Sequence, residues 1–211
     1  MIFSEYINSI KDVPVSEHLK FAQAILWLDP SHLPLGAVTL ENETMPVIKI
    51  PERAVNRFGN SVPVITITPE LFKDREHVTD IILPPSIDRL PSGAFSGCRN
   101  LKNITIPKKI KSIRQNTFDG CSDLENIFYE GSAEEWDKIS IVHQQYEVDF
   151  GDVFSGTPVQ QIVSERLLHI PGNDAIFSAN IHFRCNLSEI YRLESLIPQA
   201  DRDITELIRT V

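Results

Sequence analysis

The chain repeats itself with a period of 23 residues, and this period constrains its fold more than any other feature of the sequence. When segments 64–86, 87–109 and 110–132 are written beneath one another, apolar residues fall into shared columns. A single repeat cannot bury its apolar face alone, whereas stacked repeats turn each column into a ladder through a common core. The period therefore predicts a small solenoid. Its apolar columns are Val64, Ile87 and Ile110; Ile67, Leu90 and Ile113; Phe72, Phe95 and Phe118; Val78, Leu101 and Leu124; Ile81, Ile104 and Ile127; and Leu83, Ile106 and Tyr129.

Each repeat also predicts one short strand. Leu101-x-x-Ile104-x-Ile106 alternates in its second half, so residues 103–106 read as a strand whose isoleucines point inward. Equivalent strands are expected near 80–83 and 126–129, and stacking places all three side by side in a parallel sheet. Pro84 and Pro107 follow where a strand should stop, since proline lacks an amide donor. The phenylalanine column is expected to fill the opposite wall.

The segments FSGCRNLKNITIP at 95–107 and FDGCSDL at 118–124 resemble the BspA-type leucine-rich repeat, which runs approximately F-x-x-C-x-x-L-x-x-I-x-I-P. Upstream, VIKIP at 47–51 is similar to the first strand of that family, followed here by an irregular turn that contains Gly59 and Pro63. Downstream, 128–136 resembles its closing segment and 179–183 its final strand. The resemblance covers about 46–141 and 176–184.

The chain departs from the family pattern at several places. Arg75 stands where the repeat has its cysteine, which predicts a more polar edge for that coil. Tyr129 and Glu130 replace an aliphatic ladder residue and a proline. About 35 residues, 142–176, intrude before the final strand. The array is therefore short and atypical at both ends, as terminal repeats usually are.

The flanking segments predict helices. Apolar spacing favours helices over 2–12, 16–28, 188–197 and 202–210, with Ser16 as the N-cap of the second. Ser132 and Glu135 form a capping-box pattern that should begin a short helix carrying Trp136. Turn residues in the 142–176 segment flank a predicted strand at 159–170. We expect the terminal helices to cover the open ends of the solenoid.

The predicted fold is therefore of the α/β class. It is a short leucine-rich-repeat-like solenoid with a parallel β-sheet, capped by helices at both termini. We divide the chain into an N-terminal helical cap over 1–42, the solenoid over 43–141, an insertion and closing strand over 142–184, and a C-terminal helical cap over 185–211.

Charge and hydropathy exclude some classes of function. The net charge of -9 opposes a phosphate backbone, so we expect no nucleic-acid partner. No apolar run approaches the roughly 18 residues of a membrane span, so we expect no membrane insertion. The first 20 residues lack the features of a secretory signal, which predicts a cytoplasmic protein. Because BspA-type proteins are commonly exported, a secreted or cell-surface location is the alternative.

The three cysteines are too few for a disulfide scaffold or a zinc site, which favours a reducing compartment. Cys98 and Cys121 lie one repeat apart, so their side chains should be close enough for a disulfide. We favour the simpler interpretation, a ladder of buried reduced thiols that pack as small hydrophobic groups.

No motif in the sequence predicts catalysis. The chain has no G-x-S-x-G, no S-x-x-K and no glycine-rich phosphate loop. Its six histidines never fall into a metal-binding spacing. We therefore expect no catalytic residue, no cofactor and no metal.

The outward positions of the predicted strands are the first candidates for a binding site. Ile82 and Phe128 should project from the sheet as an apolar pair. Rimmed by polar residues, such a pair would form a partner-binding patch. The alternative is that segment 142–176 or a terminal helix covers them. The candidates on this face are Asp80, Ile82, Asn103, Thr105, Asn126, Phe128 and His182.

The second candidate is a basic cluster in the turn between two ladder residues, Ile110 and Ile113. Its charges read first as a solvated turn and second as an electrostatic contact for an acidic partner. The cluster contains Lys108, Lys109, Lys111 and Arg114.

These features predict a non-catalytic module that binds a protein or a glycan through the exposed strand face. Part of this expectation is analogy, because a fold does not fix a function. The alternative is a structural protein whose terminal helices pair copies of the chain. The identity of any partner is not encoded in these patterns.

Overall fold

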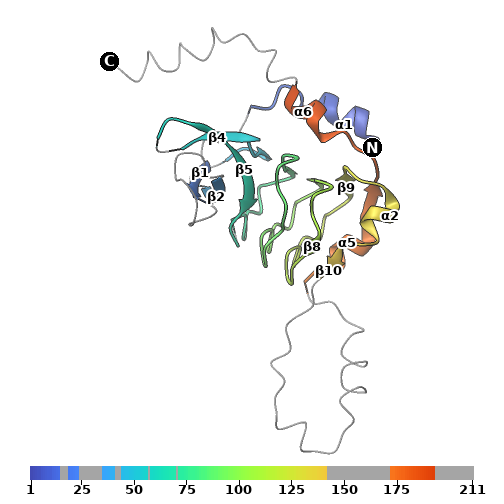
Figure 1. Ribbon diagram of the computed structural model, residues 1–211. Coiled ribbons are helices and arrows are strands. Elements are labelled where there is room, and N and C mark those ends of the chain that lie inside the picture. Colours follow the sequence, from blue (N-terminus) through green and yellow to red (C-terminus); the bar gives the residue numbers. More distant parts are fainter. Residues whose placement is uncertain are drawn as a thin grey trace, which may run out of the picture.

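The computed structural model describes residues 1–14, 19–23, 35–40, 44–56, 58–69, 71–141 and 172–192. Its centre is a five-stranded parallel sheet in the order β11-β9-β7-β6-β3 (Figure 1). The strands are β3 (Val47–Lys49), β6 (Asp80–Ile82), β7 (Asn103–Ile106), β9 (Asn126–Tyr129) and β11 (Asn180–His182). This confirms the expected parallel sheet, including its first strand near 47 and its last near 180.

The sheet register follows the 23-residue repeat. Ile81 pairs with Ile104, and Ile104 pairs with Ile127, so one apolar column becomes one ladder of the core. Ile104 and Ile106 are fully buried within that core, as predicted. Pro84 and Pro107 lie just beyond the ends of β6 and β7, as expected of residues that cannot donate to the next strand.

The opposite wall of the solenoid is a stack of phenylalanines. The ring of Phe95 lies 5.6 Å from that of Phe72 and 5.2 Å from that of Phe118, measured between centroids. Backbone bonds also join the coils here, because Phe95 N donates to Thr117 O at 3.0 Å. At Gly97 the backbone adopts φ +78°, and a Cβ there would collide with Asp74. The glycine of the repeat is thus required by close stacking of neighbouring coils.

A second, smaller set of strands forms a third side of the solenoid. β8 (Ser112–Ile113) pairs in parallel with β10 (Ser140–Ile141), and Leu90 bridges to Ile113. Leu90 and Ile113 belong to another apolar column of the repeat. The coils are therefore held together on this side as well, and the turns around β8 face solvent (Figure 1).

The N-terminal end of the solenoid carries a four-stranded sheet in the order β1-β2-β5-β4. Its strands are β1 (Leu19–Gln23), β2 (Leu35–Leu40), β4 (Arg53–Val55) and β5 (Ser61–Ile67). The irregular turn expected after residue 51 is wrong. β4 and β5 form an antiparallel hairpin, and Gly59 supplies φ +80° in its loop.

The helix predicted over 16–28 is also wrong for the residues that the structure describes, because 19–23 form β1. Leu19 is buried in the core, and Phe21, two residues later, packs against the same core. This two-residue spacing fits one face of a strand, whereas the helix prediction depended on the spacing of Leu19, Ala22 and Leu26. Pairing of β1 with β2, and of β2 with β5, decides between them.

Four helices complete the described chain: α1 (Phe3–Ile10), α2 (Ala133–Trp136), α5 (Asp174–Ser178) and α6 (Leu187–Arg192). The helices expected over 2–12 and from 188 onward are confirmed as α1 and as the described part of α6. The Ser132–Glu135 capping box is confirmed, with both reciprocal hydrogen bonds present. The strand at 159–170 and the helix at 202–210 lie outside the described residues. No helix of the described residues is long and apolar enough to cross a membrane.

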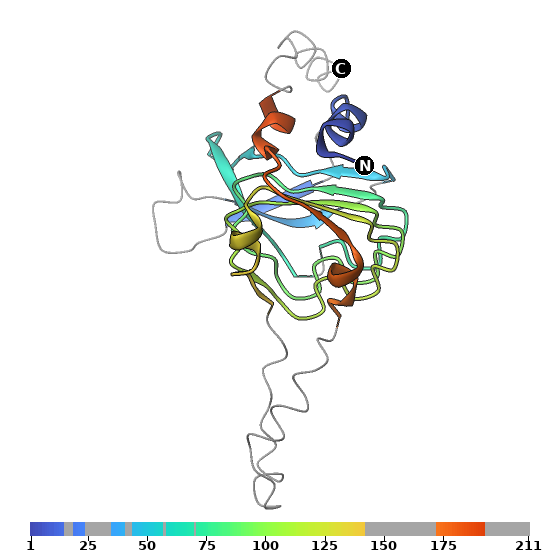
Figure 2. The same ribbon diagram turned by 90° about the vertical axis from the view of Figure 1, so that its right-hand side faces the viewer.

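The described terminal helices do not lie where we expected them. α1 and α6 lie over the outward face of the five-stranded sheet rather than over the ends of the solenoid (Figure 2). They close a second apolar cluster on that face, with Val47 packed at its margin. The reason is the apolar surface of the sheet, which would otherwise face water. The buried residues of this second core are Tyr6, Ile7, Ile10, Ile82, Phe128, Cys185, Leu187, Ile190 and Tyr191.

Candidate functional site

The exposed apolar patch predicted on the sheet is wrong. Ile82 and Phe128 are fully buried, and so is Thr105 between them. The Tyr6 ring of α1 stacks on Phe128 at 4.3 Å between centroids, and Phe3 lies 5.5 Å from it. The alternative, that a terminal helix covers the pair, is confirmed.

The Thr105 side chain forms its hydrogen bonds within the sheet. Its Oγ accepts a hydrogen bond from Leu83 N at 2.7 Å and donates one to Leu83 O at 3.1 Å. The hydroxyl therefore continues the pairing of β6 and β7 one residue beyond the end of β6. This explains a buried threonine in an otherwise apolar row.

The polar column of this face is a chain of hydrogen bonds that crosses four strands. Asn126 Nδ2 donates to Asn103 Oδ1 at 2.9 Å, and Asn103 Nδ2 donates to Asp80 Oδ1 at 2.7 Å. At the far end, His182 Nε2 lies 3.0 Å from Asn126 Oδ1. The two amides are oriented the same way along this row of hydrogen bonds. His182 Nε2 must therefore carry a proton in order to donate to Asn126 Oδ1. The sequence showed the column but not that its members bond to one another.

Two groups beside this chain of hydrogen bonds have shifted pKa values: His182 at one end, and Tyr6, which neighbours Asp80 at the other. Burial lowers the pKa of His182, and the positively charged amino terminus lowers it further. Burial raises the pKa of Tyr6 well above its ordinary value, and the neighbouring Asp80 carboxylate adds to that rise. Thr79 Oγ donates to the second oxygen of this carboxylate at 2.6 Å. Asp80 therefore receives donors on both of its oxygens.

Two residues missed by the sequence reasoning hold α6 on the sheet. The Lys49 side chain is fully buried, and its Nζ lies 3.4 Å from Ile190 O and 5.2 Å from the centroid of the Tyr191 ring. The Tyr191 hydroxyl donates to Ile50 O at 2.7 Å. Lys49 is aligned with Ile82 in the sheet register, so its outward position was visible in the sequence. The packing of α6 against Lys49 was not visible in the sequence.

The helices α1 and α6 thus cover most of the candidate binding residues on the sheet face. Asn103 and Asn126 are only 7% and 4% exposed, and His182 is half-buried against Phe128. A partner could reach the apolar residues of this face only after α1 or α6 had moved away. Whether these residues bind a partner stays a prediction.

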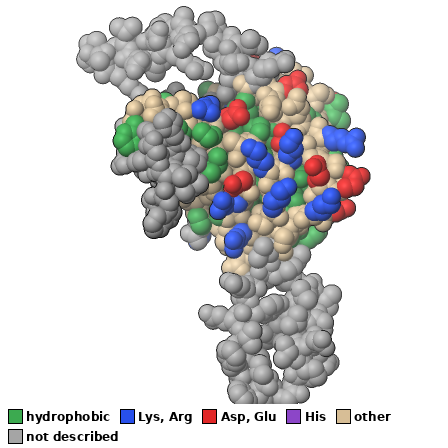
Figure 3. Space-filling model, viewed as in Figure 1, with side chains coloured by type: hydrophobic (Ala, Val, Ile, Leu, Met, Phe, Trp, Pro, Cys, Tyr) green, Lys and Arg blue, Asp and Glu red, His purple; other side chains and the backbone are tan. Residues whose placement is uncertain are grey.

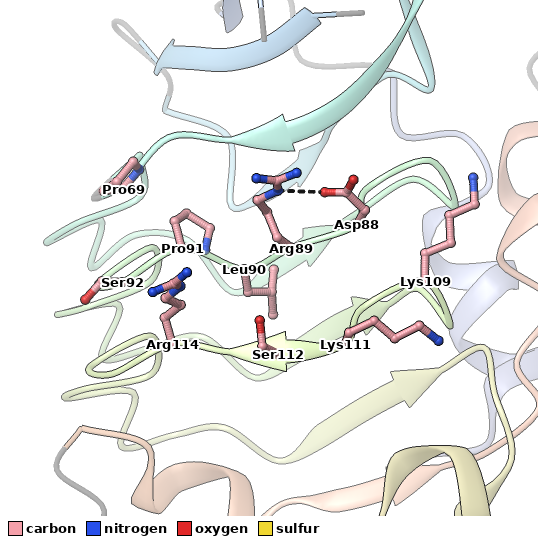
Figure 4. A pocket seen from close by; sticks show the side chains of 10 residues that line it. All are labelled: Pro69, Asp88, Arg89, Leu90, Pro91, Ser92, Lys109, Lys111, Ser112 and Arg114. Atoms are coloured by element: carbon pink, nitrogen blue, oxygen red, sulfur yellow. Dashed lines mark hydrogen bonds and ion pairs between the residues drawn. The ribbon is translucent and has the colours of Figure 1, made fainter. Parts of the chain in front are cut away.

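The basic cluster lies on a different surface, the turn side that carries β8. A groove of about 650 Å³ runs between neighbouring coils there. Figure 3 shows Lys and Arg side chains gathered on this face, with acidic side chains between them. In Figure 4 the cations surround Leu90 and Ser112, with Pro69 and Pro91 at one side. The structure brings Lys109, Lys111 and Arg114 to the groove but leaves Lys108 outside its lining.

Arg89 joins this groove from the preceding coil. The sequence reasoning missed it, although the repeat aligns Arg89 with Ser112 exactly one period later. Its guanidinium pairs with Asp88 at 2.9 Å, which raises the pKa of Arg89. Asp88 is the only acidic residue in the lining of the groove. Across the described chain, Lys109, Lys111 and Arg114 form no ion pair, so their charges stay unneutralised.

The cysteines have the environment of inert thiols. Cys98 and Cys121 are free and buried, and their Sγ atoms donate to Phe72 O at 2.9 Å and Phe95 O at 3.2 Å. Burial raises the pKa of Cys98 to about 12, and it raises that of Cys121 as well. This agrees with the expected ladder of reduced thiols and offers no nucleophile. Cys185 is also buried, and burial raises its pKa to about 12.

Metal binding finds no support in the described part of the chain. Nowhere in it do three His, Cys, Asp or Glu side chains come together in a group that could hold an ion. The one described histidine at a packed position, His182, is engaged with Asn126 and Phe128.

A comparison with protein families identifies the repeat. Residues 55–142 match the family model described as a BspA-type leucine-rich repeat region of six copies. None of the curated proteins matches the chain. The family match covers the three repeats at 64–132 and extends from residue 55, at the end of β4, to residue 142.

Several solved leucine-rich repeat structures resemble the chain. A protein from Bacteroides ovatus ATCC 8483 is 25% identical, with a TM-score of 0.45 over 55% of this chain and 29% of its own. The T. pallidum leucine-rich repeat protein is 17% identical, with a TM-score of 0.45 over 57% and 55%. A leucine-rich cell surface protein from Faecalibacterium prausnitzii A2-165 is 21% identical, with a TM-score of 0.41 over 62% and 43%. The chain thus spans about a third to a half of these proteins.

Proposed function

We propose, from the BspA-type leucine-rich repeat region that the chain carries, that it is a non-catalytic module for binding another protein. Leucine-rich repeats of this kind act in protein–protein interaction, and stacked coils provide extended surfaces for it. The finer proposal concerns the surface. Binding uses the groove face around β8, not the strand face that the sequence pointed to.

One observation carries this choice of surface. The outward sheet face is a second core, with Phe128 and Ile82 fully buried beneath α1 and α6. The groove face is open, and the side chains of Lys109, Lys111 and Arg114 are exposed there. A surface that is preformed and accessible needs no reorganisation before binding, whereas the sheet face would first have to lose two helices.

The described parts of the terminal helices do not favour the alternative role in assembly. Tyr6, Ile7 and Ile10 of α1 pack against the chain's own sheet, as do Ile190 and Tyr191 of α6. Their apolar faces are therefore occupied within one copy. Nothing about these two helices calls for a second copy of the chain.

Site-specific photo-crosslinking tests the proposal. A photoreactive phenylalanine in place of Ser140, which is exposed and paired with Ser112 of β8, reports contacts at the groove. The matched control replaces Ser188, which is exposed on α6 above the sheet. We expect discrete crosslinked partners from the Ser140 position and none from the Ser188 position. Partners captured from Ser188 alone would overturn the choice of surface.

A further inference from the structure

We infer that the groove beside β8 takes an extended peptide segment with acidic residues at alternate positions. This inference rests on the proposed protein-binding function and names the chemistry of the partner. The argument uses the charge of the groove, the spacing of its cations, and the groups that lie between them.

The groove carries a local positive charge that ion pairs leave largely unneutralised. Lys111 and Arg114 are exposed, and neither forms an ion pair within the part of the chain that the structure describes. The only carboxylate in the lining, Asp88, is already engaged with Arg89. The net charge of the whole chain is -9, but charges more than about 8 Å apart are largely screened at physiological salt. A ligand in the groove therefore meets a positive surface.

The separation of the cations favours a ligand that carries several carboxylates. Lys111 and Arg114 flank the two residues of β8, so about 10 Å of extended chain separates them. Because the side chains of an extended peptide alternate between two faces, acidic residues at every second position turn their carboxylates toward the groove, about 7 Å apart. A compact anion such as a single phosphate would reach one of these cations but not both.

The middle of the groove favours a polypeptide over other anions. Ser112 lies between the two cations, is half-buried, and its hydroxyl makes no hydrogen bond within the described chain. It can donate to a peptide carbonyl or carboxylate. At one side of the groove, the exposed Pro69 and half-buried Pro91 offer apolar contact that a polypeptide can use and an inorganic anion cannot (Figure 4).

Nucleic acid fits the groove poorly. Binding to single strands relies on aromatic side chains that stack with bases. The lining of this groove contains no Phe, Tyr, Trp or His. The acidic residues elsewhere on the molecule also repel a long phosphate chain more than a short peptide.

Fluorescence anisotropy with the full chain tests the inference. The probe is a labelled peptide library of the pattern acidic-x-acidic-x-acidic, with Ala, Val or Ser at x. The control library has Asn and Gln at the acidic positions. We expect saturable binding of the acidic library only, weakened at least tenfold by the double variant Lys111→Glu, Arg114→Glu and by raising the salt from 50 to about 300 mM.

A matched variant separates the groove from general charge. Lys11→Glu with Lys102→Glu makes the same change in net charge at exposed positions outside the groove lining, and it should bind the acidic library as the unaltered chain does. Thermal unfolding of both double variants checks their folding. A milder pair, Lys111→Gln with Arg114→Gln, gives the same test if the charge reversal disturbs the fold.

Three outcomes would overturn the inference. Equal binding of the neutral library would remove the role of the ligand's carboxylates. An equal loss in the two double variants would remove the role of the groove cations. Heparin or single-stranded DNA binding in preference to the peptides would indicate another class of partner.

The same experiments keep this inference apart from the proposed function. Loss of acidic-peptide binding together with crosslinked partners at the Ser140 position would leave the binding surface standing and remove only the acidic partner. Crosslinks confined to the Ser188 position would remove both.

Discussion

The two surfaces of this solenoid that the sequence marked as candidate binding sites differ in exposure. The outward face of the five-stranded sheet, with its apolar Ile82 and Phe128, is buried under α1 and α6. The turn face around β8, with its cations, stays open and hollowed. Apolar area removed from water stabilises the fold in proportion to its size, whereas exposed charge gains little from folding. The apolar face, whose burial is favourable, is therefore covered, and the charged face stays open.

The largest expected effect comes from the centre of the covered face. Phe128→Ala should lower the free energy of unfolding by about 3–5 kcal/mol, because Phe128 is fully buried and stacks against Tyr6 and His182. Urea unfolding followed by circular dichroism measures the change. A loss below about 1 kcal/mol would mean that α1 rests only loosely on the sheet.

Two tyrosines, Tyr6 of α1 and Tyr191 of α6, give the next effect, and substituting them should change stability differently. The Tyr191 hydroxyl donates to Ile50 O, so Tyr191→Phe leaves a buried carbonyl short of a donor and should cost about 1–2 kcal/mol. The Tyr6 hydroxyl is buried and has no hydrogen-bond partner in the described chain. Tyr6→Phe should therefore be neutral or slightly stabilising.

The same unfolding experiment on both tyrosine variants checks this contrast. Equal losses from the two substitutions would show that the Tyr6 hydroxyl does bond, with Asp80 as the partner at hand. In that case the helix α1 would be held by the polar column as well as by Phe128.

How far the sequence could predict this molecule follows from what a repeat encodes. The period placed β6, β7 and β9 correctly because each strand meets the same neighbour one repeat away. The apolar spacing of residues 16–28 predicted a helix, but Leu19 and Phe21 lie in a strand. That strand exists because of its pairing with β2, which no local pattern reveals.

The candidate site shows the same division. The sequence correctly placed Ile82 and Phe128 on the outward side of the sheet, and it left open whether a helix covered them. Periodicity says which side a residue faces, not which distant segment packs there. The groove was half visible, since Lys109, Lys111 and Arg114 are close in sequence. Arg89 needed the stacking of coils to reach them.

A smaller effect is expected from pH at the margin of the covered face. The pKa of His182 is lowered in the folded chain, while the unfolded histidine titrates near 6.5. The unfolded state therefore binds the proton first as the pH falls. The contribution of His182 to stability is complete above about pH 6.5 and is lost as the pH falls below it.

Comparing the chain with its His182→Gln variant isolates this effect. Glutamine can still donate to Asn126 but does not titrate. Unfolding free energies between pH 7.5 and 5 should fall more steeply for the unaltered chain than for the variant. Parallel slopes would indicate that His182 titrates in the folded state as it does in the unfolded chain.

The smallest effect belongs to the open face, and it tests the comparison most directly. Replacing Lys111 and Arg114 by glutamine should change the unfolding free energy by no more than about 0.5 kcal/mol, because both side chains are exposed and form no ion pair in the described chain. Relief of repulsion between neighbouring cations favours a slight gain. A loss above about 1 kcal/mol would show that these side chains hold the coils together. Their charge would then have a structural reason, and the groove could no longer be read as a surface kept free for a partner.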